Sequence, residues 1–129
     1  MDLSQITRVA LIGCGRMGIT HTQRILGQQD TTRIEVVCEP SITAYDALRT
    51  VFVRENLTPP PNQPELPQLL RDCRSRLDAA LIVTPHAYHY EQARLCLEAG
   101  LDVLLPQPAA SAGRPFESHR TRRSRPDPQ

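Results

Sequence analysis

The sequence lacks several residues and segments that would point to a function on their own. It has no lysine, because all fifteen basic residues are arginine, and this excludes a lysine that donates a proton, forms a Schiff base or clamps a phosphate. No apolar run approaches about 18 residues and no basic segment leads into an apolar one at the start, so we expect neither a membrane span nor a signal peptide. The net charge of +1 predicts no general attraction to nucleic acid or to an anionic membrane surface.

Cysteine is sparse, and its spacing excludes the common metal and redox motifs. The four cysteines, Cys14, Cys38, Cys73 and Cys96, never form a C-x-x-C pair, so we expect no metal or redox site. Four reduced thiols in a cytoplasmic protein are the simplest interpretation. Cys14 lies close to the predicted start of a helix, which would lower its pKa, but we interpret it as a small residue that fits a turn.

The most informative segment is residues 9–18, which read VALIGCGRMG. Its first four residues are apolar and predict a buried parallel strand. The next six residues follow the pattern G-x-G-x-x-G. In that pattern Gly13 allows a tight turn, Gly15 lets the backbone approach a pyrophosphate, and Gly18 lets the following helix pack closely. The N–H groups and the positive dipole end of that helix would face the anion.

A second predicted strand, residues 33–38, ends on the acidic Glu39. An acidic residue at the tip of the second strand, about 20 residues beyond the glycines, is placed to accept hydrogen bonds from an adenosine ribose. Together with the glycines it indicates a dinucleotide-binding site. The alternative from the residues alone is a doubly wound domain whose glycine turn binds no ligand, since glycines also punctuate ordinary turns.

The remaining pattern predicts an α/β fold with a doubly wound parallel sheet. Helices are expected over 19–26, 42–55, 66–76 and 88–99, and further strands over 78–83 and 102–105. Apolar strands that alternate with amphipathic helices place helices on both faces of the sheet, in three layers. Right-handed crossovers bring the strand ends at Gly13, Glu39 and Thr84 to one edge, where such sheets bind their ligands.

Residues 57–67 contain five of the twelve prolines. Proline removes a backbone donor, so a central strand is excluded there, and we expect the third strand of a doubly wound fold to be short or absent. We interpret the segment as a stiff surface loop. The alternative is a proline-rich ligand for a partner domain.

From Pro106 the periodic pattern fails, and residues 111–129 are rich in arginine and proline. They contain no run of large apolar side chains, so they cannot bury enough surface to offset their ordering entropy. We predict a dinucleotide-binding domain over 1–110 and a disordered basic tail over 111–129. A nucleic-acid-binding arm is the alternative for this tail, although its only aromatic residue is Phe116.

Four blocks of the sequence carry a resemblance to a known family. Residues 13–21, GCGRMGITH, follow the pattern G-x-G-x-M-G-x-x-H, and residues 78–85, DAALIVTP, are similar to D-A-V-x-I-A-T-P. Residues 98–105, EAGLDVLL, are similar to E-A-G-K-x-V-L-x, and His89 stands where a histidine opens the next helix. Over residues 7–110 the chain therefore resembles the N-terminal Rossmann-like domain of the Gfo/Idh/MocA oxidoreductases, which include glucose–fructose oxidoreductase and inositol dehydrogenase.

The resemblance implies a nicotinamide dinucleotide as cofactor. The glycine turn would hold its pyrophosphate, Glu39 its adenosine ribose, and the segment from Thr84 the side toward its nicotinamide ribose, although the family usually has asparagine at His86. The negative charge of Glu39 repels a 2′-phosphate and no arginine follows it directly, which favours NAD(H) over NADP(H). The implied cofactor-binding residues are Gly13, Cys14, Gly15, Arg16, Met17, Gly18, Glu39, Thr84, Pro85, His86, His89 and Gln107.

The chain departs from the family where the family places its chemistry. After the strand at 102–105 the family has Glu-Lys-Pro, with the lysine beside the nicotinamide and the reacting carbon, whereas this chain has Pro106-Gln107-Pro108. Gln107 forms hydrogen bonds but exchanges no proton. The family's catalytic histidine and aspartate come from a second domain, and residues 111–129 do not resemble the beginning of that domain. We therefore expect no catalytic residue in this chain and interpret it as truncated.

Three interpretations follow from these departures. The first is the NAD(H)-binding domain of an oxidoreductase whose full-length relatives transfer a hydride to or from a sugar- or cyclitol-type hydroxyl or carbonyl. The second is a non-catalytic dinucleotide-binding or interaction module, or a truncated remnant. The third is a complete small reductase in which His86, Tyr88 and His89 supply acid–base chemistry. Self-association into a homo-oligomer through uncovered apolar surface stays open.

Overall fold

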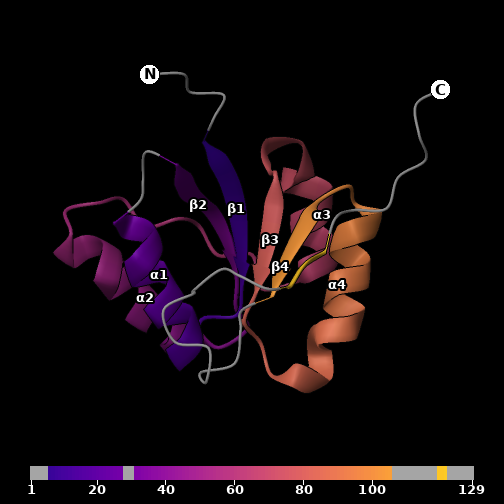
Figure 1. Ribbon diagram of the computed structural model, residues 1–129. Helices are drawn as coiled ribbons and strands as arrows, with labels where there is room; N and C mark the ends of the chain where they lie inside the picture. The colour runs from indigo at the N-terminus through magenta and orange to yellow at the C-terminus, as the bar shows by residue number, and fades with distance from the viewer. Residues whose placement is uncertain (1–5, 28–30, 106–118, 122–129) are drawn as a thin grey trace.

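The computed structural model describes residues 6–27, 31–105 and 119–121, which form a twisted sheet with helices on both faces (Figure 1). Its strands are β1 (Thr7–Ile12), β2 (Thr32–Cys38), β3 (Ala79–Ile82), β4 (Asp102–Leu105) and β5 (His119–Thr121). Their order is β2-β1-β3-β4-β5, and β1 to β4 run parallel. This arrangement confirms the predicted doubly wound α/β sheet. Because β2 and β3 lie on opposite sides of β1, the switch point of the sheet is between β1 and β3.

In the described part of the chain, two α-helices cover each face of the sheet. On one face lie α1 (Arg16–Leu26) and α2 (Ile42–Arg54), and on the other lie α3 (Leu66–Cys73) and α4 (His89–Glu98) (Figure 1). The alternating side chains of β1 supply both cores, since Val9 and Leu11 belong to the first and Ala10 and Ile12 to the second. This burial on both faces explains why the strand is apolar at every position. None of the helices in the described ranges is long and apolar enough to cross a membrane.

The proline-rich segment replaces the third strand with a single bridge, as the sequence predicted. Asn62 pairs in parallel with Val37 of β2. The Val37 N–H donates to the Pro61 carbonyl at 2.9 Å, and the Gln63 N–H donates to the Val37 carbonyl at 2.8 Å. The ladder does not continue toward the start of β2 because Pro61 has no N–H to donate.

The end of the chain differs in part from its prediction. Residues 111–129 were expected to have no regular structure, yet His119–Thr121 form β5, which pairs antiparallel with β4. An edge strand offers unpaired N–H and C=O groups to any backbone, so this pairing needs no apolar side chains and leaves no signal in the sequence. The rest of this tail, and the predicted domain boundary at residue 110, lie outside the described residues.

Candidate functional site

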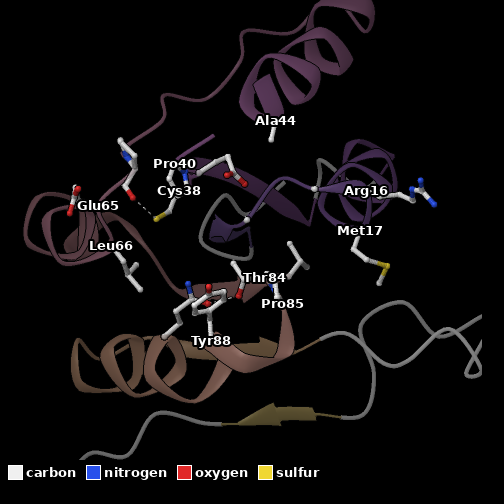
Figure 2. A pocket seen from close by; sticks show the side chains of 16 residues that line it. Arg16, Met17, Cys38, Pro40, Ala44, Glu65, Leu66, Thr84, Pro85 and Tyr88 are labelled. Carbon is white, nitrogen blue, oxygen red and sulfur yellow. Dashed lines mark hydrogen bonds between the residues drawn. The ribbon is translucent and has the colours of Figure 1, made fainter. Parts of the chain in front are cut away.

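A cleft of about 800 Å³ opens at the carboxyl edge of β1, β2 and β3 (Figure 2). Four segments line it: the glycine turn with the start of α1, the end of β2 with its continuation into α2, the loop into α3, and the chain from β3 into α4. These segments are far apart in the sequence and meet because parallel strands bring their carboxyl ends to one edge. The cleft has the volume of a small-molecule or cofactor site.

The turn between β1 and α1 requires glycine at its first position. Gly13 has φ +100°, a left-handed conformation that other residues rarely adopt. A Cβ atom there would lie 2.9 Å from Thr84 Cγ2, so the end of β3 packs directly against the turn. The Gly13 N–H donates to the Cys38 carbonyl at 2.9 Å, which joins the turn to the end of β2. The turn therefore lies between two strand ends that line the cleft.

The start of α1 presents backbone N–H groups beside open space. Gly15 is the N-cap, the first turn holds no acidic residue, and the Ile19 N–H donates to the Gly15 carbonyl at 3.0 Å. The amides of residues 16–18 precede this bond and have no partner within the helix. An added Cβ at Gly15 would meet nothing within 4 Å, whereas one at Gly18 would lie 2.8 Å from the Gly13 carbonyl oxygen. The helix thus packs closely at Gly18 and leaves Gly15 open to an anion.

The Glu39 carboxylate is held at the cleft by two backbone amides. The Cys14 N–H donates to Oε1 at 2.7 Å, and the Ser41 N–H donates to Oε2 at 2.9 Å. Ser41 also caps α2, because its hydroxyl accepts the Ala44 N–H at 3.2 Å. Each carboxylate oxygen has a second lone pair, so Glu39 is an oriented acceptor with remaining capacity for a hydroxyl group.

Asn62, which the sequence analysis did not single out, holds the backbone of Glu39. The Glu39 N–H donates to Asn62 Oδ1 at 2.9 Å, and Asn62 Nδ2 donates to the Glu39 carbonyl at 2.9 Å. An asparagine among prolines is ordinary loop composition, so no signal in the sequence points to this role.

At the end of β3 the side chains order the backbone that borders the cleft. The Thr84 hydroxyl donates to Gln92 Oε1, and His89 Nε2 lies 2.6 Å from the Thr84 carbonyl oxygen. Since a carbonyl only accepts, Nε2 carries the proton in this contact. The His86 ring is tilted against that of His89, with their centroids 5.0 Å apart. Tyr88, which is exposed, and Gln92 line the cleft beside Thr84 and Pro85 (Figure 2).

The cysteines are packing residues in this structure. All four lie buried as free thiols. Burial, and then the nearby Glu39 carboxylate, raise the pKa of the Cys14 thiol to about 12, and the same two causes with Glu65 raise the pKa of Cys38 to about 11. The thiol in the glycine turn is therefore not acidic, in agreement with its interpretation as a small residue that fits. Among the described residues no group of three side chains is arranged to hold a metal ion.

The comparison with known families decides what kind of domain this is. The model of the oxidoreductase family with an NAD-binding Rossmann fold, GFO_IDH_MocA, matches residues 7–120. The chain belongs to this family. The resemblance inferred from its motifs is thereby confirmed.

Curated relatives and solved structures agree with this assignment. Inositol 2-dehydrogenases from Rhodococcus erythropolis and Corynebacterium glutamicum are 28% and 29% identical over 84% and 82% of this chain. The chain spans 29% of the length of each of them. The WlbA dehydrogenase from Chromobacterium violaceum, solved with NADH and UDP-GlcNAcA, is 26% identical with a TM-score of 0.67, over 81% of this chain and 28% of its own. Biliverdin reductase from Synechocystis, solved with biliverdin and NADP+, is 20% identical with a TM-score of 0.62, over 79% of this chain and 29% of its own, and shows the shared fold.

The cofactor-binding residues that the resemblance implied fall into three groups in the structure. Those that line the cleft are Gly13, Gly15, Arg16, Met17, Glu39, Thr84 and Pro85. Those that support its walls without lining it are Cys14, Gly18, His86 and His89. Gln107 lies outside the described residues. Tyr88, to which one interpretation of the sequence gave an acid–base role, also lines the cleft. The lining residues that sequence reasoning missed are Cys38, Pro40, Ala44, Pro64, Glu65, Leu66, Val83 and Gln92.

Proposed function

We propose that this chain is the NAD(H)-binding domain of a Gfo/Idh/MocA oxidoreductase and that its cleft takes NAD(H). The pyrophosphate would lie on the amides at the start of α1, in the open space beside Gly15. The adenosine ribose would donate its hydroxyls to Glu39, whose carboxylate two backbone amides already orient. When bound, the nicotinamide supplies or accepts a hydride. The observation that carries this proposal is the pairing of the open glycine turn with the oriented Glu39 in one cleft.

The charge of Glu39 supports NAD(H) over NADP(H). A 2′-phosphate would bring a second negative group beside this carboxylate. Two like charges about 4 Å apart cost about 1 kcal/mol in water and about 4 kcal/mol at the effective dielectric constant near a protein surface. The residues after Glu39 are Pro40 and Ser41, so no arginine follows to offset the repulsion. We therefore expect NADH to bind at least about tenfold more tightly than NADPH.

The substrate side of the proposal comes from the relatives. By analogy with the inositol 2-dehydrogenases, we propose that the hydride passes to or from a sugar- or cyclitol-type hydroxyl or carbonyl. Within this chain, Thr84 and Gln92 would order the cleft wall, and we assign no catalytic residue. A non-catalytic dinucleotide-binding module would bind the same cofactor. Because we assign no catalytic residue to this chain, a turnover assay with NAD+ and cyclitol alcohols separates the two functions only when a catalytic domain of the family is supplied with it.

The test is a titration of the purified chain with NADH and then NADPH, followed by cofactor fluorescence. The unaltered chain should bind NADH saturably and prefer it over NADPH. Glu39→Gln removes the charge at the ribose and should reduce this preference to less than about threefold. Glu55→Gln removes a charge at the end of α2, outside the cleft, and should leave the preference unchanged. Absence of binding by a folded chain, or an unchanged preference in the Glu39 variant, would contradict the proposal.

A further inference from the structure

We infer that Asn62 is a positioning residue that holds Glu39 for the adenosine ribose and thereby supports the preference for NAD(H). This inference rests on the proposed function of the cleft. It assigns a role to the proline-rich segment 57–67, which the family motifs do not cover. Asn62 acts through Glu39 and is absent from the cleft lining.

The contacts of Asn62 extend the edge of β2 by one position. Its Oδ1 and Nδ2 atoms bond the N–H and the carbonyl of Glu39, both at 2.9 Å. Two residues earlier, Val37 exchanges backbone bonds with Pro61 and Gln63. β2 is at the outer edge of the sheet among the described strands, so without Asn62 these two Glu39 groups would have no partner from a neighbouring strand. The amide side chain supplies both the donor and the acceptor that a paired strand would supply.

The segment that carries Asn62 is itself anchored on both sides. The Tyr45 hydroxyl of α2 donates to the Pro60 carbonyl at 2.5 Å. The Cys38 thiol at the end of β2 donates to the Pro64 carbonyl at 3.5 Å, the contact drawn as a dashed line in Figure 2. Proline restricts φ, so less conformational freedom is lost when the segment takes this shape. A stiff, anchored loop is what a side chain needs to fix a neighbouring backbone.

The fixed backbone sets where the Glu39 carboxylate points. Its oxygens must reach the Cys14 and Ser41 amides at 2.7 and 2.9 Å while they keep free lone pairs for the ribose. A shift of the Glu39 backbone would lengthen these bonds and misplace the acceptor. NADPH gains little from a well-placed carboxylate, because its 2′-phosphate is repelled there. Loss of Asn62 should therefore weaken NADH binding more than NADPH binding.

A double-mutant cycle between Asn62 and Glu39 tests this role. Asn62→Ala should weaken NADH binding about three- to tenfold, the effect of a lost hydrogen bond, and NADPH binding by less than about twofold. In the Glu39→Ala background the same change should alter NADH binding by less than about twofold, since a positioning residue has nothing left to position. Gln63→Ala is the matched control, because its side chain accepts the Glu65 N–H at 3.2 Å and does not bond Glu39.

Amide hydrogen exchange gives a readout that needs no cofactor. Asn62→Ala should raise the hydrogen-exchange rate of the Cys14 amide, whose hydrogen bond the Glu39 carboxylate accepts. Gln63→Ala should leave that rate unchanged. An equal loss of NADH binding in both Glu39 backgrounds would show a general effect on the loop and overturn the inference. If the unaltered chain binds no NADH, the proposed function is overturned together with the claim on cofactor preference. Unchanged Cys14 exchange in Asn62→Ala overturns the positioning itself.

Discussion

Substitution of Gly15 by alanine separates the glycine turn's role in binding from its role in folding. The backbone at Gly15 has φ −66° and ψ −165°, which alanine adopts without strain, and its Cβ would meet nothing within 4 Å. Alanine is a poorer N-cap than glycine by a few tenths of a kcal/mol up to about 1 kcal/mol. The reduced entropy of the unfolded chain offsets this by about 0.4–1 kcal/mol. We expect the free energy of unfolding to change by less than about 0.5 kcal/mol.

The same methyl group should strongly reduce cofactor binding. It would occupy the open space in which the pyrophosphate approaches the backbone, so we expect NADH binding to weaken at least about tenfold, or about 1.4 kcal/mol. Gly18→Ala is the contrasting change. Its Cβ would lie 2.8 Å from the Gly13 carbonyl oxygen and 3.3 Å from Val83 Cγ2. Overpacking of about 1–3 kcal/mol then exceeds the helix propensity gain of about 1 kcal/mol, so this variant should lose stability.

Urea unfolding and NADH titration of the two variants make the comparison. Gly15→Ala should unfold at the urea concentration of the unaltered chain and bind poorly, whereas Gly18→Ala should unfold earlier. Parental NADH affinity in Gly15→Ala would refute the approach of the pyrophosphate to this backbone. A marked loss of stability in that variant would contradict the conclusion that the space beside Gly15 is open.

Three further predictions concern buried and paired groups. Cys14 should not react with a thiol reagent at pH 8 until urea unfolds the chain, since it is buried and its pKa is raised to about 12; rapid labelling of the native chain would contradict this. Burial, and then the charge of Arg24, lower the pKa of His21 below its usual 6.5. The unfolded state therefore binds more protons at this residue than the folded state does. The free energy of unfolding should therefore fall as the pH drops below about 6.5, and an equal fall in His21→Asn would exclude His21 as a cause. The Asp78 carboxylate accepts hydrogen bonds from the backbone N–H of Arg8 at 2.8 Å and from the Arg8 guanidinium at 3.2 Å. Asp78→Ala should therefore lower the free energy of unfolding, measured in urea, by about 1–2 kcal/mol. The control Asp46→Ala breaks only an exposed i,i+3 pair at 3.6 Å and should cost less than about 0.5 kcal/mol.

The fold was predictable because its strands and turns carry local signals. The run at residues 9–12 is apolar at every position, as a strand buried on both faces must be, and the prolines of 57–67 correctly predicted a reduced third strand. β5 left no such signal, because backbone groups pair regardless of side chain.

The candidate site was predictable only where one short segment carries the chemistry. The glycine turn and Glu39 follow from spacing along the chain, and both line the cleft. Gln92 reaches the cleft from α4 and Tyr88 from the position just before that helix, and neither residue belongs to a motif. Asn62 meets Glu39 across a loop of irregular backbone, and its two hydrogen bonds depend on that loop's conformation. Tertiary packing, rather than local sequence, decides these contacts.

The most direct test of a dinucleotide in this cleft is a map of backbone amide shifts by NMR as NADH is added to the unaltered chain. We expect the largest shifts on the amides of residues 13–18, 39 and 41, in the two segments joined by the bond from the Cys14 N–H to Glu39. Saturating shifts confined to these segments and to the end of β3 would establish the cleft as the binding site. Binding that leaves them unperturbed, or no binding by the folded chain, would contradict it.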